Sequence, residues 1–202
     1  TNILLVGLDT RAGLTAEEKK ALHVGTGNYG RPRADAVMLV HVSPGERGIT
    51  VVSLPRDSYL DLPAYTDAKG GRHPARKDRL SAAYEIGEAP MLARTVEQAT
   101  GTHIDHYVEV DFSGFLSMVD ALGGVDVCLP KPALDKPAGL DLPAGTSTVS
   151  GRDALAFVRA RTLDSDFGRM ARQQGFIASI VQKASSAGTL LNPIALNSFL
   201  DA

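Results

Sequence analysis

The sequence predicts an α/β/α sandwich built on a central mixed β-sheet, and three observations lead to this fold class. Short apolar segments rich in β-branched residues have the length of strands. Segments with helical spacing alternate with them along the chain, which is typical of helices packed on a sheet. A turn sequence at 44–48, Pro-Gly-Glu-Arg-Gly, joins two of the apolar segments as an antiparallel hairpin, so we expect a mixed sheet.

The first half of the chain supplies three strands and one short helix. Strands are predicted over residues 2–8, 36–42 and 49–54. Thr15 can cap a helix that begins after it, and Glu18 completes a capping box. Residues 63–78 are polar and rich in glycine and proline, so we expect a loop there.

The second half alternates helices with two further strands. Helices are predicted over residues 79–87, 89–99, 112–122, 151–158, 167–185 and 193–200. Strands are predicted over residues 105–110 and 125–129. Residues 130–149 form a proline-rich excursion between the last strand and the helices that follow.

The composition fits one globular domain over residues 1–202. The 202 residues are 44% hydrophobic and 22% charged, which is ordinary for a chain that buries one core. The formal net charge of -2 gives no basic field that would attract nucleic acid. Cys128 is the single cysteine, which excludes an intrachain disulfide, and we expect it to be a small buried strand residue.

The sequence itself does not predict a membrane span. No apolar segment approaches the roughly 18 residues that a spanning helix needs. The sequence begins at Thr1, without an initiator methionine and directly before a predicted strand. We therefore expect an N-terminal membrane anchor upstream of it.

Charged side chains gather where the first three predicted strands begin or end. Asp9 follows the first strand, Arg33 and Asp35 precede the second, and Arg56 and Asp57 follow the third. If the first two strands are antiparallel, all five residues meet at one sheet edge. Carboxylates among arginines suit a divalent metal and a phosphate ligand, but surface ion pairs would give the same pattern.

The helix predicted over residues 167–185 carries cations on the same stripe as its apolar residues. At about 100° per residue, Arg169, Arg172 and Gln173 share one arc with the apolar Phe176. An unpaired charge on a core-facing stripe is costly. The pattern therefore predicts either a buried anion or internal pairing, for instance of Asp166 with Arg169.

Two further arginines, Arg159 and Arg161, follow the apolar run 154–158. On a helix, residues two apart diverge, whereas in an extended chain they project to one side. We expect the helix to end here, so that both side chains can reach the same anion.

An ordered series of motifs extends over essentially the whole chain. The motifs are Asn-Ile-Leu-Leu-Val-Gly-Leu-Asp-Thr-Arg at 2–11, Arg-Ala-Asp at 33–35, Ser-Leu-Pro-Arg-Asp at 53–57, Asp-Ala-Leu-Gly-Gly-Val-Asp-Val at 120–127, Ala-Leu-Ala-Phe-Val-Arg-Ala-Arg at 154–161, Asp-Phe-Gly-Arg at 166–169 and Arg-Gln-Gln at 172–174. In this order they resemble the LytR-CpsA-Psr family of cell-wall glycopolymer phosphotransferases.

The resemblance implies both a fold and an activity. The implied fold is the sandwich described above, with an apolar tunnel for a polyprenyl tail. The implied activity is Mg-dependent: glycan phosphate passes from a polyprenyl-pyrophosphate-linked glycopolymer to a sugar hydroxyl of peptidoglycan. The implied location is the extracellular face of the bacterial cytoplasmic membrane, next to the cell wall. Two alternatives stay open: a polyprenyl-pyrophosphate hydrolase, which could also be a side activity, and a non-catalytic regulator that binds prenyl phosphate.

The resemblance also assigns roles to individual residues. Asp9 and Asp35 would bind Mg²⁺ or Mn²⁺, and Asp9, Arg56 and Asp166 would act in catalysis. The pyrophosphate would be held by Arg33, Arg56, Arg79, Arg159, Arg161, Arg169, Arg172 and Gln173. The tunnel would be lined by Leu92, Val96, Phe115, Val119, Phe176 and Ile180. Either Asp9 or Asp166, or a substrate phosphate, would activate the acceptor hydroxyl.

One motif departs from the family pattern. The family often has Lys-Ile-Asn-Ala-Ala-Tyr where this chain has Arg-Leu-Ser-Ala-Ala-Tyr at 79–84. Arg79 keeps the positive charge but replaces a point charge by a planar, five-donor guanidinium, which binds phosphate with a different geometry.

Overall fold

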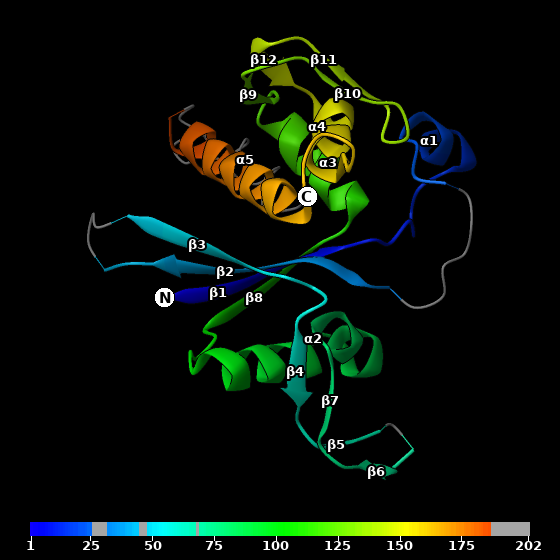
Figure 1. The fold of residues 1–202 in the computed structure, drawn as a ribbon, viewed down its shortest axis with the longest axis vertical. Coiled ribbons are helices and arrows are strands. Elements are labelled where there is room, and N and C mark those ends of the chain that lie inside the picture. Colours follow the sequence, from blue (N-terminus) through cyan, green and yellow to red (C-terminus); the bar gives the residue numbers. More distant parts are fainter. Residues whose placement is uncertain (26–31, 45–47, 68, 187–202) are drawn as a thin grey trace. The chain divides into compact units, whose positions relative to one another are not determined.

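The computed structural model describes residues 1–25, 32–44, 48–67 and 69–186 (Figure 1). The predicted helix over 193–200 and most of the predicted turn at 44–48 lie outside these residues. The chain divides into two compact units. Unit 1 comprises residues 1–10 and 29–111, and unit 2 comprises residues 11–28 and 112–202. The division does not test the expectation of a single domain over residues 1–202, which stays a prediction.

Unit 1 contains a four-stranded mixed sheet in the order β3-β2-β1-β8. Its strands are β1 (Asn2–Leu8), β2 (Ala34–Val42), β3 (Ile49–Leu54) and β8 (His106–Val110). The strand β2 pairs antiparallel with both β1 and β3, whereas β8 runs parallel to β1. The predicted hairpin and the mixed sheet of an α/β fold are thus confirmed.

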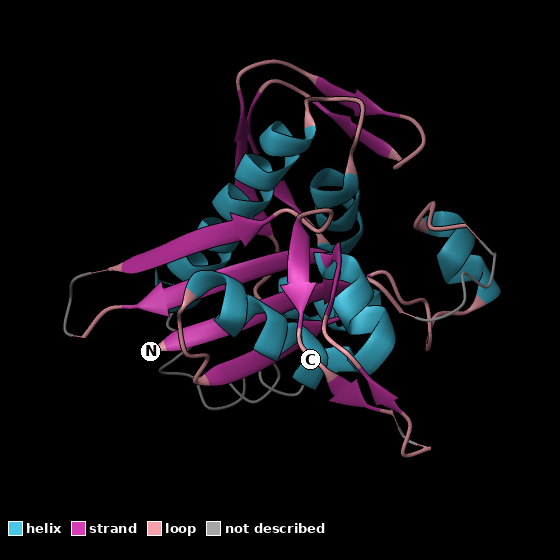
Figure 2. Cartoon of the chain, turned by 60° about the horizontal axis from the view of Figure 1, so that its bottom comes forward, coloured by secondary structure: helices cyan, strands magenta, loops and turns pink. Residues whose placement is uncertain are grey.

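Helix α2 (Leu80–Thr100) packs against one face of this sheet (Figure 2). Alternate residues of β1, Leu4 and Val6, point to that face and are fully buried. They pack with Leu92 and Val96 of α2, which are also fully buried. The burial of these side chains, which adds about 1.5–3 kcal/mol for each one, fixes the helix on the sheet.

A kink divides α2 close to the point where the sequence predicts two separate helices. Gly87 and Glu88 have non-helical backbone angles, and Glu88 has a φ of 53°. Pro90 lies two residues after Glu88 and has no backbone N–H to donate to the preceding turn. The predicted break between residues 87 and 89 is therefore confirmed, although α2 runs on as one element.

The expectation of a loop over residues 63–78 is wrong, because two short antiparallel pairs occupy this region. The first pair is β4 (Tyr59–Leu62) with β7 (Arg76–Arg79), and the second is β5 (Tyr65–Thr66) with β6 (Arg72–His73). The Asp67 carboxylate accepts hydrogen bonds from the backbone N–H groups of Lys69 and Gly71, which closes the turn. Glycine and proline content predicts the turn but cannot predict the strand pairing.

Unit 2 contains four helices in the part of the chain that the structure describes. They are α1 (Ala16–Ala21), α3 (Phe112–Ala121), α4 (Gly151–Arg159) and α5 (Asp166–Ser186). The capping box of α1 is confirmed: Thr15 Oγ1 accepts from the Glu18 N–H, and the Glu18 carboxylate accepts from the Thr15 N–H. Phe157 and Phe176 are buried in the core between α4 and α5.

The proline-rich excursion over 130–149 also pairs as strands. The strand β10 (Ala133–Asp135) pairs with β11 (Leu140–Leu142), and β12 (Gly145–Val149) pairs with β9 (Val125–Leu129). Cys128 of β9 is exposed, so the expectation of a buried cysteine is wrong. The reason is the alternation of β9, in which Val125 and Val127 take the core face and Cys128 the outer face.

Among the described helices, none combines the length and the apolar character needed to cross a lipid bilayer.

Candidate functional site

The predicted gathering of charges at one edge of the unit 1 sheet is confirmed. Asp9 lies beside Arg33, because the Asp9 N–H donates to the Arg33 carbonyl oxygen at 3.1 Å. The pairing of β1 with β2 then shifts: Gly7 pairs with Ala36, but Leu8 pairs with Ala34. Asp35 is the extra residue of this β-bulge, and a bulge re-aims its side chain relative to the regular strand.

The turn after β3 brings Arg56 to the same edge. The Ser58 N–H donates to the Pro55 carbonyl at 2.9 Å, which reverses the chain. Arg56 forms an ion pair and hydrogen bond with Asp35, and its Nε lies 3.4 Å from Asp57. Partial burial alone would lower the pKa of Arg56, but the attraction of Asp35 and Asp57 outweighs it and raises the pKa.

The first turn of α2 is attached to this edge through the backbone. The N–H groups of Leu80 and Ser81 donate to the carbonyls of Ser58 and Arg56, both at 2.9 Å. The residue before the helix, Arg79, has its NH1 3.7 Å from the Asp57 carboxylate. These contacts satisfy two N–H groups at the helix N-terminus, which has no intrahelical partner for them.

A further ion pair joins the residue before β2 to α2. Arg33 Nε lies 3.0 Å from Glu85 Oε1, and both side chains are at least one-third exposed. The edge of unit 1 therefore holds three of the predicted phosphate-binding residues, Arg33, Arg56 and Arg79, each next to a carboxylate. Both interpretations of the charge pattern, ion pairs and a phosphate site, are compatible with these pairs.

A tyrosine pair near the same end of the sheet was not predicted. The hydroxyl groups of Tyr84 in α2 and Tyr107 in β8 both donate to Glu109 Oε2, at 2.9 and 2.8 Å. Burial raises the pKa of both tyrosines, and the Glu109 carboxylate raises it further. Both phenols therefore remain hydrogen-bond donors at neutral pH. Tyr84 lies 25 residues before Glu109 in the sequence, so no local motif predicts that both tyrosines meet the same carboxylate.

In unit 2, the predicted phosphate ligand Arg172 of α5 is largely enclosed by the chain. Its side chain is 8% exposed and forms an ion pair with Asp164 at 3.0 Å. The guanidinium also donates to the carbonyl oxygens of Phe157 and, at 2.7 Å, Ala160. These contacts and its position 5.3 Å above the Phe157 ring give Arg172 a structural role that the sequence-based assignment did not include.

Three other predicted ligands of unit 2 also contact the chain itself. Gln173 Nε2 donates to the Val158 carbonyl at 3.0 Å. Arg159 donates to the carbonyls that end α1, Leu22 at 3.2 Å and His23 at 3.3 Å, and lies over the Phe112 ring. Arg169 pairs with Asp166 at 2.7 Å, the internal pairing considered above.

Arg161 differs from these residues. Helix α4 ends at Arg159, and Ala160 is extended (φ -53°, ψ 132°), so the predicted exit from the helix is confirmed. The Arg161 backbone N–H donates to Asp135 at 2.7 Å. Its guanidinium is exposed and has no hydrogen bond or ion pair within the described part of the chain.

The six predicted tunnel residues fall into two apolar cores, one in each unit. Leu92 and Val96 belong to the core of unit 1. The other four belong to or pack against the core of unit 2: Phe115, Val119, Phe176 and Ile180. Five of the six are buried, and Phe115 is partly buried and stacks on Phe176 at 5.6 Å. Their role as a tunnel lining stays a prediction.

A mixed α/β fold that gathers arginines and carboxylates at one sheet edge is an arrangement suited to phosphate-bearing ligands. The chain matches the LytR_cpsA_psr family over residues 1–202. It therefore belongs to this family, as the ordered motifs predicted.

Individual relatives are similar over most of this chain. It is 41% identical over 194 residues to a "Probable cell wall biosynthesis protein LcpB" of Corynebacterium glutamicum, covering 96% of the chain and 44% of that relative. It is 33% identical to "Polyisoprenyl-teichoic acid--peptidoglycan teichoic acid transferase TagU" of Enterococcus faecalis, covering 85% of the chain and 54% of that relative. The chain thus spans about half the length of the curated relatives it matches.

A solved structure supports the fold. The "LytR-CPS2A-psr family protein YwtF (TagT) with bound octaprenyl pyrophosphate lipid" superposes with a TM-score of 0.66 at 27% identity. The match covers 92% of this chain and 65% of that one.

Proposed function

We propose that this chain is the catalytic part of a phosphotransferase that attaches a glycopolymer to the bacterial cell wall. Its donor would be a polyprenyl-pyrophosphate-linked glycan, and its acceptor a sugar hydroxyl of peptidoglycan. The relatives named for teichoic acid transfer and cell wall biosynthesis, and the structure with bound octaprenyl pyrophosphate, support this substrate class. The observation that carries the proposal is the sheet edge of unit 1, where Asp35 leaves the regular strand to meet Arg56.

The edge has the chemistry that phosphoryl transfer requires. This reaction depends on positioning and charge neutralisation more than on covalent assistance from the protein. Arg33, Arg56 and Arg79 carry guanidinium groups whose present partners are carboxylates at a partly exposed surface. Surface ion pairs contribute only about 0–1 kcal/mol. A pyrophosphate with several charged oxygens can therefore replace these partners at low cost.

Asp9 and Asp35 fit a magnesium or manganese ion. Both offer hard carboxylate oxygens at neighbouring positions of the same edge. Within the described residues, no cluster of three or more potential ligands forms. Mg²⁺ is commonly held by one or two carboxylates together with substrate phosphates and water. The ion, when bound, would neutralise charge on the phosphate oxygens while the arginines orient the group.

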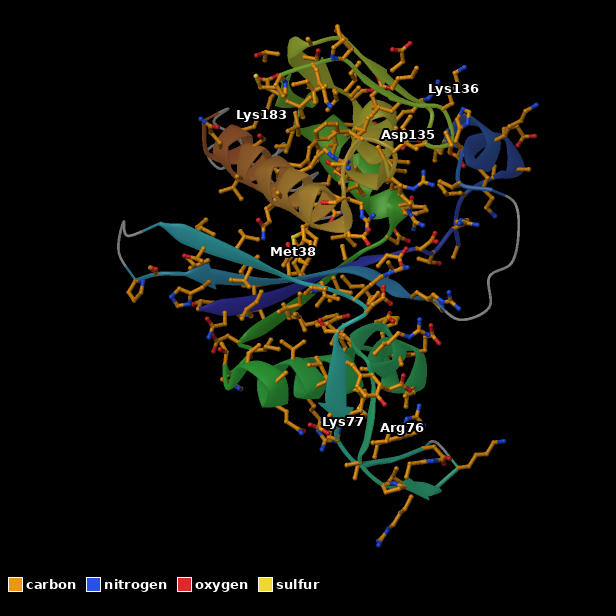
Figure 3. The ribbon with its side chains drawn as sticks, viewed as in Figure 1. Met38, Arg76, Lys77, Asp135, Lys136 and Lys183 are labelled. Carbon is orange, nitrogen blue, oxygen red and sulfur yellow. The ribbon has the colours of Figure 1, made fainter. Side chains whose placement is uncertain are left out.

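The second face of the unit 1 sheet is suited to a prenyl tail. The strand register places Ile3, Leu5, Met38 and Val40 on the face opposite α2. Figure 3 shows Met38 directed away from the sheet on that side. Val108 of β8 shares this face and is 41% exposed. Met38 itself is 5% exposed, so only the exposed part of this face could take a prenyl tail, with a gain of about 0.8 kcal/mol for each buried CH₂.

In the proposed reaction, the acceptor hydroxyl attacks the phosphorus next to the glycan. The bond between this phosphorus and the bridging oxygen breaks, and prenyl phosphate leaves. Asp9 is the candidate base at the edge of unit 1, and Asp166, 82% exposed and paired with Arg169, is the candidate in unit 2. The reaction would take place at the outer face of the cytoplasmic membrane, where lipid-linked glycan and peptidoglycan meet.

The test is turnover of a lipid-pyrophosphate glycan in the presence of peptidoglycan fragments and Mg²⁺. Wild-type protein should produce glycan-linked peptidoglycan, and Arg56→Ala should reduce the rate by about tenfold to 100-fold. Arg94→Ala, a change of an exposed α2 cation on the part of the helix beyond the kink, is the matched control. A wild-type protein without turnover, or full activity in Arg56→Ala, would count against the proposal.

The same assay separates the two alternatives. A hydrolase would release glycan phosphate equally with and without the acceptor. A regulatory binder would retain the prenyl pyrophosphate without any chemistry and without dependence on Mg²⁺. Chelation followed by addition of Mg²⁺ or Mn²⁺ tests the metal: we expect activity to be lost and then regained, and Asp35→Asn to require a higher ion concentration.

A further inference from the structure

The segment that carries Arg159 and Arg161 is held through both its carbonyl groups and its N–H groups. The residues that bind the carbonyls belong to the sequence motifs described above, whereas the residue that binds the N–H groups does not. On the carbonyl side, Arg172 donates to Phe157 and Ala160, and Gln173 donates to Val158. All three carbonyls belong to the last turn of α4 or its C-cap, where intrahelical donors are missing. This side of the clamp comes from α5.

On the N–H side, the clamp is the carboxylate of Asp135 at the end of β10 (Figure 3). One carboxylate oxygen, Oδ2, accepts from the Arg161 N–H at 2.7 Å and from the Thr162 N–H at 3.0 Å. The other, Oδ1, accepts from the Ala138 N–H at 3.0 Å, inside the β10–β11 turn. Asp135 is 2% exposed, so it is a buried charge that three backbone donors satisfy.

The electrostatics agree with an ionised Asp135. Burial alone would raise its pKa, but hydrogen bonds from the N–H groups of Thr162, Ala138 and Arg161 outweigh burial and lower the pKa. The carboxylate therefore stays charged at neutral pH and holds the two N–H groups strongly.

The result is a residue with a fixed backbone and an available side chain. The backbone at Arg161 is held by Asp135, whereas the exposed guanidinium has no partner among the described residues. A ligand-binding cation gains affinity from such an arrangement, because the ordering of its backbone is completed before the ligand binds.

We propose that Asp135 is a positioning residue that presents Arg161 to the phosphate groups of the substrate. The proposal deepens the proposed function, on which it rests for the role of Arg161 as a phosphate ligand. Asp135 does not contact the substrate; it acts through the segment 160–162, whose N–H groups at Arg161 and Thr162 it binds.

Asp135→Asn tests the clamp with little change of shape. The amide replaces one carboxylate oxygen by an NH₂ group, which cannot accept a hydrogen bond. Since both oxygens of Asp135 accept backbone N–H groups, either orientation of the amide loses at least one of them. The matched control is Asp141→Asn, which removes the same charge at an exposed position of β11 in the same hairpin.

The experiment is a double-mutant cycle read by calorimetric binding of farnesyl pyrophosphate to the full chain. We expect Arg161→Ala to weaken binding by about tenfold to 100-fold, and Asp135→Asn by about tenfold. If Asp135 acts through Arg161, the double variant binds no more weakly than Arg161→Ala alone. Asp141→Asn should bind within about twofold of the wild type.

Amide hydrogen exchange of the wild type provides a readout that does not depend on the stability of any variant. We expect the amides of Arg161 and Thr162 to exchange slowly, although they lie outside regular secondary structure. Fast exchange at both positions would overturn the clamp. Additive effects in the cycle, or unchanged affinity in Asp135→Asn, would overturn the positioning role alone. A wild type that does not bind farnesyl pyrophosphate would overturn the proposed function as well.

Discussion

The arginines of the two units are held in different ways. At the sheet edge of unit 1, Arg33, Arg56 and Arg79 lie next to carboxylates and are at least one-third exposed. In unit 2, Arg159 and Arg172 donate to backbone carbonyls, which are part of the fold. A carboxylate can be replaced by another anion, such as phosphate, whereas a backbone carbonyl must keep its donor. Arg159 and Arg172 therefore support the fold of unit 2, whereas the three arginines at the unit 1 edge have partners that another anion could replace.

The largest effect on stability is expected for Arg172→Ala. The change leaves the Asp164 carboxylate and two carbonyls without their donor, and should lower the free energy of unfolding by about 3 kcal/mol. Urea denaturation measures this free energy. The control is Arg152→Ala, which removes an exposed cation of α4 and should leave the free energy of unfolding within about 0.5 kcal/mol of the wild type. Unchanged stability with lost pyrophosphate binding would make Arg172 a ligand group instead.

An intermediate effect is expected for Arg159→Ala. This side chain closes the C-terminus of α1 through the carbonyls of Leu22 and His23, and its loss should cost about 1–2 kcal/mol. Hydrogen exchange should increase in α1 before it increases elsewhere in unit 2. Arg161→Ala is the matched comparison, since its guanidinium is exposed and its removal should leave stability within about 0.5 kcal/mol. Equal losses in the two variants would remove the distinction between the arginines.

A smaller effect on stability is expected for Arg56→Ala in unit 1. Its side chain is 34% exposed, and its pairs with Asp35 and Asp57 should contribute no more than about 1 kcal/mol. Urea denaturation is the measurement, and added salt should reduce the difference between wild type and variant. A loss as large as that of Arg172→Ala would contradict the contrast between the two regions.

The contribution of Asp135 to stability should be constant near neutrality and decrease only in acid. The pKa of Asp135 is lowered in the folded state, so its contribution to stability is present above the unfolded value of about 3.9. That contribution is lost as the pH falls through the folded pKa. The stability difference between wild type and Asp135→Asn should therefore shrink below about pH 4 in urea denaturation. A difference that is constant down to strong acid would show that Asp135 does not titrate with folding.

Local signals made much of the fold predictable. The capping box of α1 depends on residues three apart, and the kink in α2 on Gly87, Glu88 and Pro90, which lie within four residues. The hairpin of β2 and β3 follows from alternation and a short turn. The pairs β4–β7 and β5–β6 were missed, because their strands are short and their partners are separated by polar residues.

The site was predictable to the extent that its residues adjoin strand ends. Asp9, Arg33 and Arg56 were identified because each follows or precedes an apolar strand. Asp135 was not, since its carboxylate meets Arg161 and Thr162, 26 and 27 residues further along the chain. Pairing over such a distance depends on how β10 and α4 pack, and nothing in the sequence around Asp135 indicates it.

The β-bulge places Asp35 outside the regular pairing of β1 with β2, so the sheet does not need this residue. Removal of this one residue would leave Gly7 and Leu8 opposite consecutive residues of β2, so that the ladder would become regular. A single-codon deletion could thus abolish the carboxylate and improve the pairing at once. If Asp35 acts as proposed, one deletion would thus give a chain that keeps the sheet of the family fold and lacks this carboxylate.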